Sequence, residues 1–545
     1  MQQSNRPKEG SGAETASAPP PADPAPPPAA PALGIAQEQK LVTAREKKEA
    51  PRDALKNGYR NANLKDETTY DAEEYNRIEE NLFLRASINP LSTFSIDVDT
   101  AAYSNLRRFI EQGQLPPKDA VRIEELINYF PYEYPEPEGD RPFSITTELS
   151  AAPWNPTHQL VSIGLQGKRL ATEELPPSNL VFLLDVSGSM NSPNKLPLLK
   201  KAFRMLVDRL SAKDRVAIVV YAGAAGLVLP PTPGNQKDKI IDAIERLEAE
   251  GSTAGGKGIQ LAYEVARQNF MPEGNNRVIL ASDGDFNVGI SSESELVQLI
   301  EDYRDRGVFL SVLGFGMGNL KDAKMEQLAD KGNGNYAYID RPLEAKKVLV
   351  KEMGATLHTI AKDVKIQVEF NPAKVLAYRL IGYENRLLRS QDFNDDTKDA
   401  GELGAGHSVT ALYEIVPVGV QSSVELQPVD SLRYQQNPAL LAAYNSNELM
   451  LVKLRYKAPD ATESQLIQQP LLDRATKLEN ASNNFKFAAA VAELGMLLRD
   501  SQFKGNASFE QVLQLANQSK GTDLDGYRGE FIELVEKSKT LAKKQ

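Results

Sequence analysis

The sequence predicts an α/β domain with a doubly wound, mostly parallel sheet, inserted in a flanking β-sandwich and followed by a C-terminal helical segment. Three observations support this fold class. Apolar runs alternate with amphipathic helical patterns between residues 177 and 361, strand-like segments stand on both sides of that region, and residues 483–545 have a helical pattern. A chain of 545 residues is too long to fold around one hydrophobic core, so several domains are expected.

Residues 1–80 predict an extension outside the folded core. Pro19–Pro31 is mostly proline and alanine, a composition that cannot bury enough apolar surface to fold and that forms a semi-rigid tether. The residues that follow are charged and weakly periodic. Met1–Ser4 has no basic segment leading into an apolar one, so we expect no secretory signal in the chain as given.

The composition argues against several classes of function. The chain has 63 Lys and Arg residues against 74 Asp and Glu residues, so no broad basic surface for nucleic acid is expected. No run of about 18 apolar residues occurs, which argues against a transmembrane helix. Cysteine is absent, and the three histidines (His158, His358, His407) are too widely spaced for a zinc motif. A protein or a cation is therefore the expected partner.

Residues 81–176 predict two helices and the first strands of the sandwich. The expected elements are a strand at Ser95–Thr100, a helix through Tyr103, Leu106 and Ile110, a helix at Val121–Phe130, and strands at Phe143–Leu149 and Gln159–Leu165. Asp97 and Asp99 lie just before the first helix. We favour capping of that helix by Asp99 or Thr100 over cation binding by the aspartate pair.

Residues 177–361 predict strands that alternate with helices. The apolar runs are typical of strands buried on both faces of a parallel sheet. The expected strands are Leu180–Leu184, Val216–Tyr221, Val278–Ala281, Val308–Phe315 and Tyr336–Ile339. The expected helices are Lys195–Leu210, Lys237–Leu247, Gly258–Asn269, Glu293–Asp305, Asp322–Ala329 and one from Leu343, with His358 in this last helix. Ligands of such domains bind at the carboxyl ends of the strands.

Residues 362–482 return to a β pattern, and residues 483–545 form the helical segment. Further strands are expected at Val364–Phe370, Val375–Leu380, Ser408–Ile415 and Glu448–Tyr456. One sandwich built from both sides of the α/β domain is the economical arrangement. We interpret the acidic loop Asp392–Glu402 as a solvated hairpin loop in preference to a calcium site, and His407 as structural. The helical segment has an apolar face that packs on the sandwich or docks a partner.

The residues that carry chemistry follow two of the expected strands. Asp185, Ser187 and Ser189 come directly after the first apolar run, and Asp283 follows the strand that ends at Ala281. A glycine-rich loop between them presents Thr253. Two carboxylates and three hydroxyls suit a hard divalent ion and leave one coordination position open. An open position invites a carboxylate from another molecule.

Three other interpretations of these loops fail. Gly251–Gly258 resembles a nucleotide phosphate loop, but Gly258 stands where a magnesium-binding hydroxyl is required. The loop from Asp283 begins like an EF-hand but lacks its glycine and final glutamate. Ser187 lacks the flanking glycines of a hydrolase nucleophile. A capped turn that holds no ion remains the structural alternative for the first loop.

Asp285 and Asn287 lie two and four residues beyond Asp283. Because the EF-hand interpretation fails, we expect them to shape the turn after the strand. Contact with the outer coordination shell of the ion is the alternative.

The pattern D-x-S-x-S at Asp185–Ser189, followed by Thr253 and Asp283, resembles the metal-ion-dependent adhesion site of von Willebrand factor type A domains. The resemblance covers about residues 177–361. It implies that Ser187 and Ser189 ligate the ion directly, that Thr253 does so directly or through water, and that both aspartates hold coordinated waters.

The flanks resemble the bacterial YfbK-like proteins, in which an A domain lies between an N-terminal segment and a C-terminal domain. The residues that carry this resemblance are Asn89–Ser95, Val121–Glu125 and Asp392–Asp396. The expected division of the chain is an extension at 1–80, helices and strands at 81–176, the A-like domain at 177–361, completion of the sandwich at 362–482, and helices at 483–545.

The expected function is that of a metal-dependent protein-binding module and not an enzyme. It would use Mg²⁺ or Mn²⁺, with Ca²⁺ as an alternative, to capture an Asp or Glu side chain of a partner protein. An envelope scaffold or assembly factor with a structural metal site is the second hypothesis, and a metal-assisted hydrolase the third. The tether resembles the linker of an exported lipoprotein, so we expect a lipid-anchored, extracytoplasmic protein, with a cytoplasmic location as the alternative.

Overall fold

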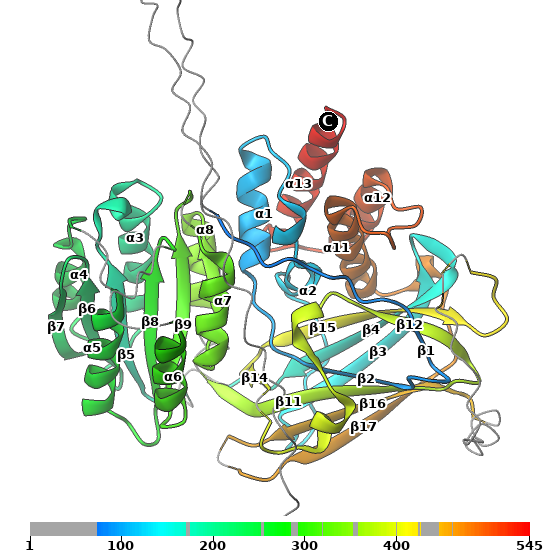
Figure 1. Ribbon diagram of the computed structural model, residues 1–545, viewed down its shortest axis with the longest axis horizontal. Helices are drawn as coiled ribbons and strands as arrows, with labels where there is room; N and C mark the ends of the chain where they lie inside the picture. Colours follow the sequence, from blue (N-terminus) through cyan, green and yellow to red (C-terminus); the bar gives the residue numbers. More distant parts are fainter. Residues whose placement is uncertain are drawn as a thin grey trace, which may run out of the picture. The chain divides into compact units, whose positions relative to one another are not determined.

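The computed structural model describes residues 73–544, apart from 171–174, 252–254, 285–292, 319, 353–357, 399, 423, 425, 427–445 and 460 (Figure 1). The Pro/Ala-rich tether, Thr253, Asp285 and Asn287 therefore lie outside the described residues. None of the helices in the described part is long and apolar enough to cross a bilayer.

The α/β domain is built on a six-stranded sheet with the order β10-β9-β8-β5-β6-β7. All neighbouring pairs are parallel except β6 and β7, which are antiparallel. The strands are β5 (Ser178–Asp185), β6 (Arg215–Tyr221), β7 (Ala225–Pro233), β8 (Asn275–Ser282), β9 (Val308–Phe315) and β10 (Tyr336–Ile339). The sequence did not predict β7, because its prolines and exposed residues lack the apolar pattern of the central strands.

Helices cover both faces of this sheet. Alternate residues of β5 point to opposite sides, so that Phe182 packs among one set of helices and Leu183 among the other. The first set is α3 (Leu196–Val207), α4 (Lys237–Glu245) and α8 (Pro342–Lys346), continued by the π-helical turn η4 (Lys347–Lys351). The second set is α5 (Gly255–Gln268), α6 (Glu293–Arg304) and α7 (Asp322–Lys331).

Two further sheets pack face to face beside this domain (Figure 1). The first has the order β1-β12-β15-β4-β3 and the second β13-β2-β11-β16-β17, with β14 also paired to β11. Their strands are β1 (Leu84–Arg85), β2 (Leu91–Ser95), β3 (Phe143–Ala152), β4 (Asn155–Gly167), β11 (Thr359–Phe370), β12 (Val375–Ile381), β13 (Leu387–Leu388), β14 (Gly401–Gly404), β15 (Ser408–Pro417), β16 (Glu448–Lys457) and β17 (Gln465–Leu472).

Each of these sheets contains strands from both sides of the α/β domain. β4 pairs with β15, and β2 pairs with β11, although the whole α/β domain separates the partners in the sequence. The chain leaves the sandwich and returns to it at neighbouring points: a Cβ added to Gly167 would lie 3.0 Å from Cδ1 of Ile360. Neither sheet can form from the residues on one side alone.

The C-terminal helices cover the outer face of the five-stranded sheet, together with the N-terminal helices. The N-terminal pair is α1 (Ala101–Glu111) and α2 (Ile123–Asn128), and the C-terminal set is α11 (Asn483–Arg499), α12 (Phe509–Ser519) and α13 (Tyr527–Ala542). Phe130, Phe487 and Phe531 form an aromatic cluster in this core, which also buries Trp154, the one tryptophan of the chain. The predicted C-terminal helices are thus confirmed.

Four local expectations were wrong. The strand near residue 95 ends at Ser95 rather than Thr100, and the first helix has no side-chain cap. His358 precedes β11 outside any helix. The acidic segment Asp392–Glu402 is not a plain hairpin loop, since it begins in the 3-10 helix η6 (Ser390–Asn394) and its end enters β14.

Candidate functional site

The carboxyl ends of β5 and β8 bring two buried aspartates to one edge of the sheet. The strands are parallel neighbours with Leu184 opposite Ala281, so that Asp185 and Asp283 follow on the same side. Neither aspartate has any exposed surface. Burial raises the pKa of Asp185, and the charge of Asp283 raises it further. The structure therefore brings together the two strand-end acids that the sequence singled out.

Both carboxylate oxygens of Asp185 are held by neighbouring donors. Oδ1 accepts a hydrogen bond of 2.9 Å from the backbone N–H of Ser187. Oδ2 accepts hydrogen bonds from the hydroxyls of Ser282, at 3.0 Å, and Tyr221, at 3.3 Å. Sequence reasoning missed Tyr221 and Ser282, although each is the last residue of a strand next to β5. Their place at the carboxyl ends of the predicted strands, beside Asp185, could have identified them.

Ser187 and Ser189 present a pair of hydroxyl oxygens beside the acids. The two Oγ atoms are 3.0 Å apart. Adjacent ligands of an octahedral magnesium ion, each about 2.1 Å from the metal, are separated by about 3.0 Å. Ser187 is buried and Ser189 is exposed, so the pair reaches from the acids to the surface. The spacing and the all-oxygen donor set therefore fit a small divalent cation.

The loop that carries Thr253 is tied to the same turn. The N–H of Gly188 donates to the carbonyl of Gly251 at 3.0 Å, and the N–H of Glu250 donates to the carbonyl of Val186 at 2.8 Å. These bonds fix the start of the glycine-rich loop beside the serine pair. The position of the Thr253 hydroxyl itself lies outside the described residues.

Lys195 is an additional member of the site that the sequence did not predict. Its ammonium Nζ lies 2.7 Å from Oδ2 of Asp283, and its side chain is only 8% exposed. Gly316 makes room for this side chain, because a Cβ there would lie 2.4 Å from Cε of Lys195. Nothing in the sequence marks this role, since Lys195 has the pattern of an ordinary first residue of a helix.

The charges at the strand ends follow from these contacts. Asp185 and Asp283 supply two negative charges when ionised, and Lys195 supplies one positive charge within the same buried region. A bound divalent ion would leave the site with one net positive charge. A site of that charge would attract an anionic group, and a carboxylate is one of the hard oxygen ligands that such ions prefer.

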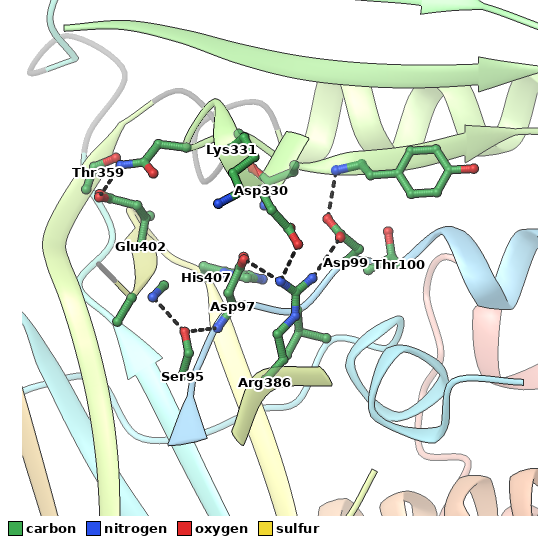
Figure 2. A pocket seen from close by; sticks show the side chains of 18 of the residues that line it. Ser95, Asp97, Asp99, Thr100, Asp330, Lys331, Thr359, Arg386, Glu402 and His407 are labelled. Atoms are coloured by element: carbon green, nitrogen blue, oxygen red, sulfur yellow. Dashed lines mark hydrogen bonds and ion pairs between the residues drawn. The ribbon is translucent and has the colours of Figure 1, made fainter. Parts of the chain in front are cut away.

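A second cluster of charges lies at the opposite, amino-terminal end of the sheet, around a cavity of about 350 Å³ (Figure 2). Arg386 lies at its centre. Its guanidinium pairs with Asp97 at 3.1 Å, with Asp99 at 3.3 Å and with Asp330 at 2.6 Å. The other carboxylate oxygen of Asp99 accepts the N–H of Tyr336 at 2.7 Å. The interpretation of Asp99 as a helix cap was therefore wrong: the aspartates surround an arginine that joins the α/β domain to the sandwich.

Family models match three consecutive parts of the chain. Residues 69–162 match "von Willebrand factor", residues 179–351 match "von Willebrand factor type A domain", and residues 355–541 match "Uncharacterized protein YfbK, C-terminal". The middle match spans the six-stranded sheet and its helices.

Curated relatives and solved structures are similar to different shares of the chain. "Uncharacterized protein YfbK" of Escherichia coli is 45% identical over 469 residues, which are 85% of this chain and 80% of that protein. Protein sll0103 of Synechocystis is 25% identical over 51% of this chain and 74% of that protein. Among solved structures, "von Willebrand factor type A from Catenulispora acidiphila" covers 70% of this chain and 87% of its own, with 16% identity and a TM-score of 0.38. The ArnB paralog VWA2 of Sulfolobus acidocaldarius covers 74% of this chain and 98% of its own, with 17% identity and a TM-score of 0.37.

The identity to the Escherichia coli protein extends over most of both chains and includes the sandwich as well as the α/β domain. The chain therefore belongs to the YfbK family and carries a von Willebrand factor type A domain.

Proposed function

We propose that the strand-end site binds Mg²⁺ or Mn²⁺ and uses the ion to capture an Asp or Glu side chain of a partner protein. The observation that carries this proposal is the pair of serine oxygens, held 3.0 Å apart beside two buried aspartates. Von Willebrand factor type A domains mediate protein–protein interaction, which supports a binding function at this site. Ca²⁺ is the alternative ion.

In this proposal Ser187 and Ser189 ligate the ion directly. Asp185, whose Oδ2 is held by Ser282 and Tyr221, would accept hydrogen bonds from waters on the ion, and so would Asp283. When bound, the ion supplies a hard positive centre for a carboxylate. Thr253 is proposed as a further ligand, with Asp285 and Asn287 as outer contacts.

We propose that the A-domain site acts by binding and not by catalysis. The three histidines of the chain lie elsewhere: His158 in β4, His358 before β11, and His407 between β14 and β15. General acid–base chemistry at the strand ends would therefore depend on the buried aspartates, which already carry hydrogen bonds and an ion pair. A metal-assisted hydrolase is the less supported alternative.

Isothermal titration of chelator-stripped protein with Mn²⁺ and Mg²⁺ tests the ion site. We expect one Mn²⁺ per chain for the wild type, and at least about a hundredfold weaker binding for Asp185→Asn, which keeps the side-chain shape and removes the charge. Asp238→Asn, at an exposed position in the first turn of α4, is the matched control and should bind Mn²⁺ like the wild type.

A second measurement tests the capture of acidic side chains. Immobilised protein is exposed to a peptide array in which each Asp or Glu peptide has an Asn or Gln counterpart. We expect retention of acidic peptides with Mn²⁺ and their release by EDTA. Equal binding of both peptide sets, or binding that survives EDTA, would contradict the proposal and favour a scaffold whose working surface is the sandwich or the C-terminal helices.

We further propose that the protein acts in the bacterial envelope, held there by a lipid anchor. The mostly Pro and Ala composition of residues 19–31 supports this, since such a tether would raise the binding site above a membrane surface. Fractionation of cells that express the natural gene tests the location.

A further inference from the structure

A serine, a histidine and a glutamate lie in one hydrogen-bonded line where β4 begins and β15 ends in the five-stranded sheet. Nε2 of His158 is 2.7 Å from Oγ of Ser422, and Nδ1 of His158 is 2.6 Å from Oε1 of Glu414. His158 belongs to β4, Glu414 belongs to β15, and Ser422 follows β15 in the loop beyond it. We infer that Ser422, His158 and Glu414 form a hydrolytic triad that cleaves carboxylic esters with an apolar acyl group. This inference goes beyond the proposed metal-dependent binding and does not rest on it.

The neighbours of Glu414 set the direction of the hydrogen bonds. Oε2 of Glu414 accepts a hydrogen bond of 2.9 Å from Arg379, and Glu414 is almost fully buried. Burial alone raises the pKa of Glu414, but the hydrogen bond from His158 and the charge of Arg379 lower it below its usual value. An ionised carboxylate can only accept, so Nδ1 of His158 donates to Glu414, and in that tautomer of the neutral ring Nε2 is the acceptor for the hydroxyl of Ser422.

A serine nucleophile must lie within hydrogen-bond distance of its general base, and Ser422 lies at that distance from His158. Its Oγ also accepts the N–H of Val424 at 3.1 Å, which leaves the hydroxyl proton directed at His158. A serine within hydrogen-bond reach of a histidine, itself oriented by a carboxylate, is the arrangement that activates a hydroxyl for attack on a carbonyl. His158 is 1% exposed, whereas Ser422 is half-buried, so the nucleophile is the member that solvent reaches.

The surroundings of Ser422 indicate the class of substrate. A cavity of about 600 Å³ is lined by Ser422, by Arg85 and Gln421, and by five aliphatic residues, Leu376, Val416, Val420, Val424 and Leu426. The aliphatic side chains suit an apolar acyl group and the single arginine offers a positive charge. Nε of Arg85 is buried and has no hydrogen-bond partner among the described residues, so it is available to negative charge that develops on a carbonyl oxygen.

The reaction balances with water as the only co-reactant. Oγ of Ser422 bonds to the ester carbonyl carbon while its proton passes to Nε2 of His158. The C–O bond of the ester then breaks, and the leaving alkoxide takes that proton as an alcohol. Water attacks the acyl-serine, gives a proton to His158, and releases the carboxylic acid as Ser422 regains its proton.

Labelling of the full chain with a fluorophosphonate probe, followed by peptide mapping, tests the nucleophile. We expect one label on Ser422, absent in Ser422→Ala. Ser446→Ala is the matched control, because Ser446 accepts the N–H of the residue two positions on at 3.1 Å, as Ser422 does, but lies in a different loop. It should label like the wild type. No label, or a label on another residue, would overturn the inference.

Hydrolysis of soluble p-nitrophenyl esters tests the activity itself. We expect turnover that rises from acetate to octanoate, that persists in EDTA, and that falls more than about a hundredfold in Ser422→Ala. Glu414→Gln should lower kcat with little change in KM, since Glu414 positions His158 and does not touch the ester. Equal rates for the wild type and Ser422→Ala would contradict the inference. A parallel assay on phosphatidylcholine vesicles shows whether the acyl group comes from a membrane lipid or from a soluble ester.

Discussion

Lys195 sets the charge of the strand-end site before any ion binds. Its ammonium group lies 2.7 Å from Asp283, and both groups are nearly shielded from solvent. A divalent ion that interacts with the carboxylate of Asp283 would compete with Lys195 for it. We therefore expect the lysine to stabilise the ion-free form of the site and to weaken its affinity for the proposed metal ion.

Lys195→Met removes the ammonium group and keeps most of the aliphatic chain that packs on Gly316. We expect this variant to bind Mn²⁺ about tenfold more tightly, a gain of about 1.4 kcal/mol, in isothermal titration. Lys200→Met is the control, because Lys200 lies on the same helix but donates to the carbonyl of Glu245. Unchanged or weaker binding by Lys195→Met would mean that the ion pair does not oppose the metal.

The sequence predicted the site residues whose spacing is local. Asp185, Ser187 and Ser189 lie within five residues, and parallel strands had to bring Asp283 to the same edge. Lys195 and the Ser422–His158–Glu414 line could not be predicted in this way. Their contacts join residues 88, 256 and 264 positions apart, and no residue type or interval in the sequence marks them.

Helix α7 is the element that carries the acidic side of the domain junction. Asp322 of α7 pairs with Arg122 at 2.5 Å. Glu326 and Asp330 of the same helix pair with Arg386, at 3.2 Å and 2.6 Å respectively. Arg386 is 10% exposed and sits in the short 3-10 helix η5 (Glu384–Arg386). Removing this arginine would take the cation away from two buried carboxylates, Asp99 and Glu326, and from the half-buried Asp97 and Asp330.

Arg386→Met should therefore cost about 3–5 kcal/mol of the free energy of unfolding near pH 8, measured by urea denaturation. Burial raises the pKa of Asp330 to about 6 even with the arginine present. A raised carboxyl pKa means that stability is lost as pH rises toward that pKa and is recovered below it, so the deficit should shrink at pH 5. Arg389→Met, whose side chain is 72% exposed, should change stability little at either pH. A deficit that does not depend on pH would contradict this account.

The elements that the sequence predicted best are those whose burial is visible as a simple pattern of apolar residues. The strands β9 and β10 have the predicted bounds, because helices cover both faces of the sheet there and strands buried on both faces have continuous apolar sequences. The edge strands β7 and β17 were missed. β17 has the sequence Gln-Leu-Ile-Gln-Gln-Pro-Leu-Leu and is largely exposed, so its pairing with β16 depends on the backbone of its neighbour and not on its own pattern.

At the scale of the whole molecule, buried ion pairs link the A domain to the helical core. Arg107 of α1 pairs with Asp340 at 2.5 Å and with Glu344 at 2.7 Å, both in the A domain. The same guanidinium pairs with Glu530 of α13 at 2.9 Å. Because these contacts are lost if either part unfolds alone, we expect residues 73–544 to unfold in one cooperative transition.

Trp154 offers a test of this coupling, since it is fully buried in the helical core outside the A domain. Mn²⁺ at about 100 times its Kd should add about 2.7 kcal/mol to the free energy of unfolding. We expect the tryptophan fluorescence transition in urea to shift to a higher midpoint by the same amount as the far-UV ellipticity. In Asp185→Asn, the addition of Mn²⁺ should leave the midpoint of the fluorescence transition unchanged. A shift in ellipticity alone would show that the A domain unfolds independently.

The neighbouring positions of Gly167 and Ile360, where the chain leaves and re-enters the sandwich, bear on the history of such proteins. Recombination at this point could replace the inserted domain by any domain whose own ends lie close together. No strand of the sandwich would be broken by such an exchange. The arginines at the junction restrict that freedom, because an incoming domain without acids opposite Arg107, Arg122 and Arg386 would bury unpaired positive charge. The backbone thus permits exchange of the inserted domain, and the junction arginines favour the retention of domains that carry matching acids.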